Sequence, residues 1–363
     1  MRVLLQSRAD LLALPAGDTV QLLETKRWLE ELGVNADHST ELTPGLDGYD
    51  MVHLFNLTRV AETIAQCENA VRRGKPIVVS PIYWNPEEYI MHENPRQQGA
   101  LLKYWRQDNP LRRKVVESAA LLLPNAEGEA RLIEKDLGVT APCRVVPNGA
   151  DPGFSGADAG EFVARLEVND FVLCCARISP RKNQLALVRA TRGLGLQVVF
   201  IGPVNDPFYL EACKREQGRS HHFLGHMPQS QLATAYAAAR VHVLPSWFET
   251  PGLASLEAAM AGCNVVSTDR GTAREYFGDL AWYCDPADID SIRNAVLAAW
   301  SAPRRPGLAA LVTRRFTWEH AARATISAYE EVLSRKAARP RPPAPEGPPP
   351  GRPSRRQNTA LPS

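Results

Sequence analysis

The chain has 363 residues, which is enough for two domains that each bury a core of their own. With 44% hydrophobic and 23% charged residues and a net charge of +2, it is an ordinary globular sequence whose charge gives no general case for nucleic-acid binding. The sequence lacks the roughly 20 consecutive apolar residues that span a bilayer. Its 7 cysteines are odd in number and have no metal-type spacing. We therefore expect a reduced, cytoplasmic protein without a bound metal.

Short apolar runs alternate with helical patterns from one end of the chain to the other. In the first half, the pattern predicts strands at residues 3–6, 51–55, 77–80, 120–123 and 144–146, and helices at 19–32, 60–73, 111–119 and 126–137. In the second half, it predicts strands at 171–175, 197–201, 241–244, 264–267 and 280–283, and helices at 253–261, at 288–300 and from 316 to about 336. Near-continuous apolar strands separated by helices indicate parallel sheets with helices on both faces.

Residues 147–153 divide the chain, because two prolines and two glycines in seven residues are typical of a linker. We predict a first Rossmann-like domain over residues 1–150 and a second over 151–315, facing each other across a cleft. A C-terminal helix at 316–336 is expected to return to the first domain. Residues 337–363 are rich in Pro and Arg with few bulky apolar residues, so they are expected to form a disordered tail.

Residues 245–266 are the most informative stretch. A turn with Glu249 and Gly252 joins a predicted strand to a predicted helix that begins at Leu253. Gly252 lets a ligand approach the backbone, and the first amides of the helix form an anion site. Glu257 lies roughly 7 Å further along the helix axis. The spacing suits a sugar nucleotide, with its phosphates at the helix tip and a sugar hydroxyl beyond. The alternative is that Glu249 is an ordinary residue near the helix cap and that Glu257 is a solvated residue of the helix.

This stretch resembles the Glu-x7-Glu signature of glycosyltransferase family 4, with Glu249 and Glu257 as the two acids. Members of that family are retaining glycosyltransferases with the GT-B fold of two Rossmann-like domains. The resemblance implies that Glu249 holds hydroxyls of the donor sugar near its anomeric carbon. It also implies that Glu257 binds the ribose of the nucleotide.

Two further loops resemble phosphate-binding elements of the same family. Residues 176–183 match its Gly-Arg-x4-Lys element through Arg177 and Lys182, with alanine where glycine is usual. Arg offers a rigid fork and Lys a mobile charge, so the two can neutralise one leaving diphosphate. Gly17 stands before the helix at 19–32, where the family has a glycine loop. A plain helix cap by Asp18 or Thr19 is the alternative there.

The remaining candidate residues come from positions that match the family less closely. The resemblance implies that His226 lies near the nucleotide base, with a surface-loop histidine as the alternative, and that Thr272 lines the donor pocket. Many relatives carry a first-domain histidine near the acceptor hydroxyl, but residues 80–86 contain none. The acceptor site is therefore unassigned, and its candidates are Tyr83, Trp84, His53 and Asn56. The two aromatic residues predict either a sugar-stacking platform or burial under a loop, and His53 is either a cleft residue or a core histidine.

The resemblance predicts transfer of a sugar from a nucleoside diphosphate sugar to a hydroxyl of a glycan, a glycolipid or a cell-surface polysaccharide precursor, without a further cofactor. Two alternatives stay open: a GT-B-fold epimerase or phosphorylase, and a non-catalytic partner subunit. The missing histidine and the replaced glycines keep the partner-subunit alternative open. Apolar and basic residues at 101–105 and 112–114 predict either an ordinary surface or a peripheral contact with the inner face of a membrane.

Overall fold

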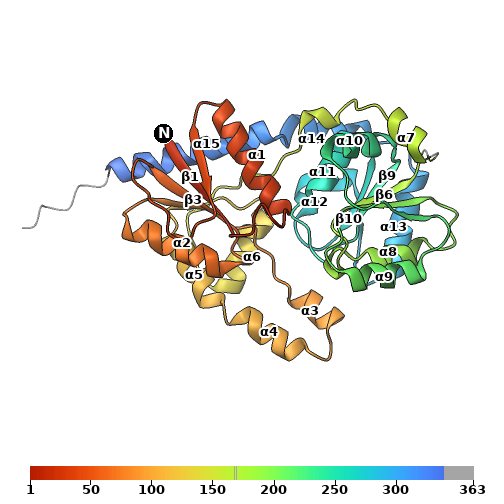
Figure 1. Cartoon of the computed structure of the whole chain (residues 1–363), viewed down its shortest axis with the longest axis horizontal. Coiled ribbons are helices and arrows are strands. Elements are labelled where there is room, and N and C mark those ends of the chain that lie inside the picture. The colour runs from red at the N-terminus through yellow and green to blue at the C-terminus, as the bar shows by residue number, and fades with distance from the viewer. Residues whose placement is uncertain (167, 169, 339–363) are drawn as a thin grey trace, which may run out of the picture.

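The computed structural model describes residues 1–166, 168 and 170–338. These residues form two α/β domains that lie side by side, each built on one parallel sheet (Figure 1). The architecture predicted from the alternation of apolar strands and helices is therefore confirmed.

The first domain contains a five-stranded sheet in the order β2-β1-β3-β4-β5. Its strands are β1 (Arg2–Gln6), β2 (Asn35–Ser39), β3 (Met51–Phe55), β4 (Ile77–Ser80) and β5 (Leu121–Leu122). Helices α2 (Val60–Arg72), α5 (Asn109–Ser118) and α6 (Glu127–Leu137) share one hydrophobic cluster with the sheet. The opposite face packs against α1 (Gly17–Glu31).

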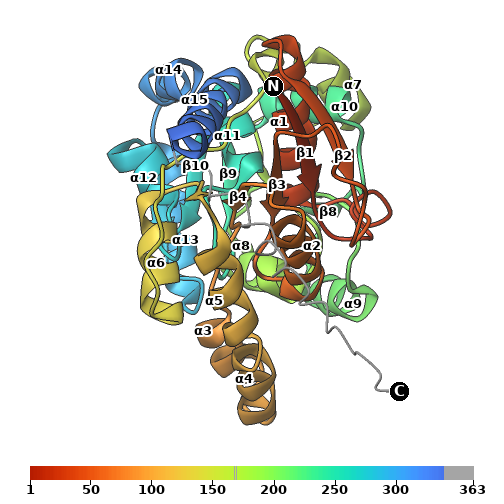
Figure 2. The same ribbon diagram turned by 90° about the vertical axis from the view of Figure 1, so that its left-hand side faces the viewer.

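Two short helices, α3 (Glu87–Glu93) and α4 (Gln98–Arg106), project from the first domain beyond its sheet (Figures 1 and 2). The described side chains of α4 include none that is buried. The sequence pattern does not predict either helix.

The second domain contains a six-stranded sheet in the order β11-β10-β9-β6-β7-β8. Its strands are β6 (Val172–Cys175), β7 (Val198–Ile201), β8 (His221–Phe223), β9 (Val241–Leu244), β10 (Asn264–Thr268) and β11 (Trp282–Cys284). One face packs on α8 (Gln184–Thr191), α9 (Pro207–Glu216) and α13 (Ile289–Ser301). The other packs on α7 (Gly160–Leu166), α10 (Gln229–Ala238), α11 (Leu253–Met260), α12 (Ala273–Phe277) and α14 (Pro306–Arg315).

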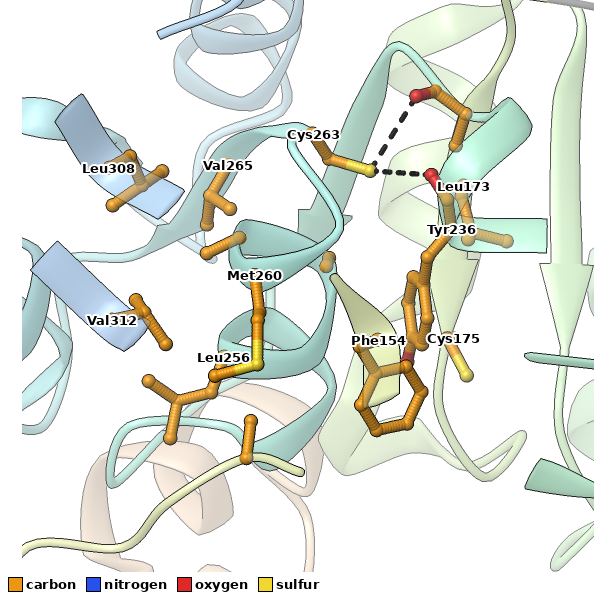
Figure 3. Packing of buried hydrophobic residues seen from close by; sticks show 14 of the residues in the cluster. Phe154, Leu173, Cys175, Tyr236, Leu256, Met260, Cys263, Val265, Leu308 and Val312 are labelled. Carbon is orange, nitrogen blue, oxygen red and sulfur yellow. Dashed lines mark hydrogen bonds between the residues drawn. The ribbon is translucent and has the colours of Figure 1, made fainter. Parts of the chain in front are cut away.

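The core of the second domain fixes the position of α11. Leu256 and Met260 of this helix lie in one buried cluster with Leu173 of β6 and with Tyr236 of α10 (Figure 3). The Cys263 thiol contacts the Tyr236 carbonyl oxygen at 3.0 Å, just after the helix ends. A helix held on this side leaves its N-terminal end at the carboxyl edge of the sheet, where ligands of such sheets bind.

The chain crosses between the domains twice, and the two crossings lie side by side. The Ala150 amide donates to the Phe316 carbonyl at 2.9 Å. Gly149 has no room for a side chain, because a Cβ there would lie 2.2 Å from the Thr317 carbonyl carbon. After the second crossing, α15 (Trp318–Ala338) packs on the first domain through Tyr329 and Val332. The predicted tail at 337–363 lies outside the described residues, apart from the last two residues of α15.

The sequence-based predictions differ from the structure at several further elements. The predicted strand at 144–146 is not a strand, although the Arg144 amide donates to the Leu122 carbonyl at 2.9 Å beside β5. The pattern misses β2, a strand of polar sequence, and β8, which has only three residues. It also misses α9, whose N-terminus is capped by the Asp206 carboxylate. A strand or helix without an apolar run or period cannot be read from such a pattern.

Candidate active site at the junction of the two domains

Most of the predicted site residues lie on loops at the carboxyl ends of parallel strands. Arg177 and Lys182 follow β6, Glu249 and Gly252 follow β9, and Thr272 follows β10. These three strands are neighbours in the order β10-β9-β6, so their loops meet at one edge of the sheet. Parallel strands bring such loops together even though they are far apart in the sequence.

Lys182 and Glu249 form an ion pair between their Nζ and Oε1 atoms. The two side chains are only 14% and 7% exposed. Burial lowers the pKa of Lys182 to about 8, with Glu249 opposing this shift and the neighbouring arginines adding to it. Burial alone would raise the pKa of Glu249, but Lys182 and Arg181 hold it below the ordinary value. The pair is therefore ionised at neutral pH, with one oxygen of Glu249 bound to Lys182.

The turn before α11 brings the backbone of Gly252 close to Glu249. Gly252 has φ of 86°, and a Cβ there would lie 2.9 Å from Cδ2 of Leu244 and 3.2 Å from Oε2 of Glu249. The amides of Leu253 and Ala254 donate to no partner among the residues that the structure describes. The first amides of α11 are therefore available to an anion.

The first domain faces this helix tip through Gly17, the first residue of α1. A Cβ on Gly17 would lie 4.0 Å from Cδ1 of Leu253, so the N-terminal ends of α1 and α11 approach each other. Of the two predicted capping residues, Thr19 takes part in the helix cap, because the amide of the N-cap residue Ala16 donates to its Oγ1 at 3.0 Å. Asp18 forms an ion pair with Arg8.

Glu257 lies on α11 within reach of both domains. Its Oε2 accepts a hydrogen bond of 2.9 Å from the Tyr236 hydroxyl. Burial raises the pKa of Glu257 to about 7, and Glu24 on α1 of the first domain raises it further. The Tyr236 bond opposes this rise and holds the carboxyl group in place, with its other oxygen free of any hydrogen bond among the described residues.

Arg177 has no ion pair or side-chain hydrogen bond among the described residues. Burial and the nearby Arg181 lower its pKa, while Asp18 of the first domain raises it. The Arg177 guanidinium thus lies between the two domains with its donors available.

Sequence reasoning missed Arg8, a buried arginine just after β1. Its Nε and Nη2 donate to both Asp18 carboxylate oxygens at 2.7 and 3.0 Å, and Nη1 donates to Asp10 at 2.7 Å. The Asn56 side chain also donates to Asp18, at 2.9 Å. Arg8 follows the first strand by only two residues, and this position at a strand end is the signal in the sequence that could have identified it as a site candidate.

The structure separates the four acceptor candidates. His53 is a core residue, because its ring nitrogens contact the Tyr329 hydroxyl at 2.6 Å and the Ser80 hydroxyl at 2.9 Å. Its side chain is buried, and burial lowers its pKa to about 3. Tyr83 is also buried, with its hydroxyl donating to Asp136 at 3.0 Å. His53 and Tyr83 are therefore structural residues. Asn56, which has φ of 80°, uses its side-chain amide to donate a hydrogen bond to Asp18.

Trp84 is the acceptor candidate that reaches the site. It is half-buried, and its ring lies 6.1 Å from that of Phe248, next to Glu249. The guanidinium carbon of Arg181 lies 5.3 Å from the centre of the Trp84 ring. The two aromatic candidates thus differ: Tyr83 packs in the core, while Trp84 contacts the second domain.

Thr272 and His226 are the two remaining predicted donor contacts. Thr272 is buried and its Oγ1 has no hydrogen-bond partner among the described residues, while its amide donates to the Glu249 carbonyl at 2.9 Å. His226 is exposed in the loop after β8. Glu275, near Thr272, accepts hydrogen bonds of 2.9 and 2.7 Å from the Glu127 and Gly128 amides, so it binds the first domain.

The described residues contain no group of three or more His, Cys, Asp or Glu side chains that could hold a metal ion. None of the described helices is long and apolar enough to cross a membrane.

Comparisons with known proteins identify relatives of the second domain and of the fold. Residues 162–306 match the family model of glycosyl transferases group 1. The chain is 30% identical to the O-antigen chain mannosyltransferase B of Escherichia coli, over 46% of this chain and 47% of that protein. It is 31% identical to the D-inositol 3-phosphate glycosyltransferase of Stackebrandtia nassauensis, over 63% of this chain and 58% of that protein. The chain thus spans about half the length of the curated relatives it matches.

Solved structures define the fold more completely. Sucrose-phosphate synthase from Thermosynechococcus elongatus superposes with a TM-score of 0.77 at 16% identity, covering 92% of this chain and 100% of that one. Anabaena HepE in complex with UDP-glucose superposes with a TM-score of 0.70 at 15% identity, covering 91% and 100%. The chain therefore has the GT-B fold. Its second domain carries the match to the group 1 family model.

Proposed function

We propose that this protein is a retaining glycosyltransferase of family 4. It transfers a sugar from a nucleoside diphosphate sugar to a hydroxyl group of a glycan, glycolipid or polysaccharide precursor. The observation that carries the proposal is the convergence of Arg177, Lys182, Glu249 and the free amides of α11 at one edge of the second sheet. The group 1 family match over this domain supports it.

In this proposal the diphosphate binds where positive charge is concentrated. The guanidinium of Arg177 has no ion pair among the described residues, and the amides at Leu253 and Ala254 lack partners there too. Lys182 completes the site by exchanging part of its bond to Glu249 for a phosphate oxygen. Positive groups aimed at a leaving group stabilise its developing charge in the transition state. No further cofactor is needed in this scheme.

Two carboxylates would hold the rest of the donor. Glu249, released in part from Lys182, accepts hydrogen bonds from hydroxyls of the sugar. Glu257 accepts from a ribose hydroxyl, with Tyr236 fixing its orientation at 2.9 Å. Thr272 offers its buried hydroxyl, which has no hydrogen-bond partner among the described residues, to the sugar or phosphate. We assign His226 to the base side on the family resemblance alone.

The reaction would proceed on one face of the sugar. The bond between the anomeric carbon and the diphosphate oxygen breaks, and a bond from the acceptor oxygen forms on the same face. The acceptor proton passes to an oxygen of the leaving phosphate. This scheme needs no basic side chain in the first domain, which fits the absence of a histidine from residues 80–86.

The first test measures melting temperatures against a panel of nucleotide sugars, followed by release of free sugar from the donor that stabilises the protein. A ligand at 100 times its Kd stabilises the fold by about 2.7 kcal/mol, so the shift is measurable. Glu249→Gln should retain nucleotide binding and lose sugar release. A protein that no nucleotide sugar stabilises would refute the proposal. Binding without turnover, with or without added acceptors, would favour the partner-subunit alternative, and isomerised donor would favour an epimerase.

Peripheral membrane contact is a second, separate proposal for α4. Tyr104 on this helix is 69% exposed, and Leu101 and Leu102 are half-buried beside Lys103 and Arg106. Sedimentation with anionic vesicles at low salt tests the contact. Protein that stays in the supernatant would contradict it.

The basic run after α4 contributes less to this surface than the sequence predicts. Arg112 is 1% exposed, and Lys114 forms an ion pair of 2.6 Å with Glu68. Arg106 of α4 is also paired, with Glu87 at 2.6 Å, so the cationic groups available to lipid are mainly Lys103 and the exposed Arg113.

A further inference from the structure

The loop after β6 carries one cation more than the donor proposal uses. Arg177, Arg181 and Lys182 lie on this loop, and Glu249 forms an ion pair with Lys182 alone. Among the described residues, Arg181 has no carboxylate partner, and its side chain donates one hydrogen bond, from Nη1 to the Phe248 carbonyl at 3.2 Å. If Arg177 and Lys182 neutralise the donor diphosphate, the charge of Arg181 remains available.

Arg181 reaches the first domain while it still acts electrostatically on Arg177 and Lys182 of its own loop. Its guanidinium carbon lies 5.3 Å from the centre of the Trp84 ring, on the segment that follows β4. It also acts electrostatically on Tyr89 of α3. Arg177, by contrast, acts on Asp18 near the start of α1, so the two arginines face different parts of the first domain.

The surroundings of Arg181 favour binding of a charged group of a ligand. Trp84 lies 6.1 Å from Phe248 and 6.3 Å from Tyr89, measured between ring centres, and all three residues are half-buried. An arginine flanked by aromatic rings is partly desolvated, and its planar donors match the oxygens of a phosphate or carboxylate. Glu249 follows Phe248 in the chain, so an anion bound here lies beside the reaction centre on the acceptor side.

We propose that Arg181 and Trp84 form an acceptor subsite for a sugar or polyol that carries an anionic group, a phosphate or a carboxylate. This inference rests on the proposed function, because it assigns the acceptor side of the same site. Arg181 binds the anionic group, and Trp84 holds Arg181 and flanks the acceptor ring. Arg181 is then a specificity-determining residue, whose loss changes the choice of acceptor more than the affinity for the donor.

The test measures acceptor binding with the donor half of the site already filled. Wild-type protein is saturated with the nucleoside diphosphate (of uridine, guanosine, adenosine or thymidine) that most raises its melting temperature. Glucose, glucose 6-phosphate and glucuronate are then titrated by calorimetry. We expect glucose 6-phosphate, glucuronate or both to bind at least tenfold more tightly than glucose. The comparison of these two sugars shows whether a phosphate or a carboxylate is preferred.

Two substitutions and one control locate the effect. Arg181→Gln should remove the preference for the anionic sugar, while the nucleotide Kd stays within about twofold. Arg181→Lys should keep part of the preference, since the charge remains but the planar fork is lost. Arg323→Gln, on the exposed outer side of α15, removes the same charge elsewhere and should change neither quantity.

Three results would overturn the inference. Equal binding of glucose and both anionic sugars by the wild type would remove the anionic subsite. If Arg181→Gln weakens nucleotide binding by the same factor as it weakens binding of the anionic sugar, Arg181 belongs to the donor-binding half of the site. A wild-type protein that binds none of the four nucleoside diphosphates would refute the proposed function itself, and the acceptor subsite with it.

Discussion

Replacing Lys182 with alanine separates the structural role of the Lys182–Glu249 pair from its proposed role toward the diphosphate. The variant leaves the Glu249 carboxylate, only 7% exposed, without its cation. Removing one partner of a buried ion pair typically costs about 3–5 kcal/mol of folding free energy. The loss of a positive group aimed at a developing anion typically lowers kcat by a factor of about 10²–10³.

The two effects respond differently to a second substitution. In the double variant Lys182→Ala/Glu249→Gln, no buried charge is left unpaired, so most of the folding stability should return. Activity should not return, because the diphosphate still lacks its cation and the donor sugar also lacks the Glu249 carboxylate. Urea unfolding measures the first effect, and initial rates of sugar release from the stabilising donor measure the second.

A matched surface pair provides the control. Lys114 and Glu68 form an ion pair of 2.6 Å with side chains 57% and 43% exposed. Lys114→Ala should therefore change stability by less than about 1 kcal/mol and leave turnover unchanged. If Lys182→Ala releases sugar within tenfold of the wild-type rate, Lys182 does not neutralise the leaving group and the reasoning fails.

Other predictions concern affinity, stability and the domain interface. The affinity of the free protein for a nucleoside diphosphate should be highest between about pH 7 and 8. It should fall at lower pH because Glu257 gains a proton, and at higher pH because Lys182 loses one. Glu257→Gln should remove the loss of affinity at low pH, and a calorimetric affinity that does not change with pH would contradict both assignments. Tyr236→Phe should weaken nucleotide binding by about tenfold by freeing the Glu257 carboxyl, so an unchanged Kd would exclude this role. Gly252→Ala should cost about 1–3 kcal/mol in urea unfolding, since φ is 86° and the new Cβ meets Leu244; an unchanged midpoint would show that the turn relaxes freely. Glu275→Gln should speed hydrogen exchange at the two α6 amides that it binds, and equal protection would show that this interdomain contact is weak.

The sequence predicts the second domain well because its site residues follow strong apolar strands. The run Val-His-Val-Leu at β9 is fully buried, and a turn residue and a helix start come directly after it. Such an order places Glu249 and Gly252 at the sheet edge before any coordinates are known. What the order does not give is the pairing of Glu249 with Lys182, which are 67 residues apart in the chain.

The first domain is harder to predict because its polar contacts have no local pattern. Arg8 reaches Asp18 and Asp10 through a loop that folds back on itself, and neither spacing belongs to a motif. His53 stands in an apolar strand, and only the structure shows that Tyr329, 276 residues later, occupies one of its ring nitrogens. Pattern reasoning therefore identifies residues at strand ends but cannot tell which of them are used up by distant partners.

The central claim is transfer with retention at the donor site of the second domain, and one measurement tests it directly. Proton NMR follows the sugar first released or transferred from an α-linked nucleotide sugar, before mutarotation. We predict that the α anomer appears first and that Glu249→Gln abolishes the signal. A β anomer as the first product would contradict the retaining mechanism, and no turnover from any nucleotide sugar that binds would contradict catalysis itself.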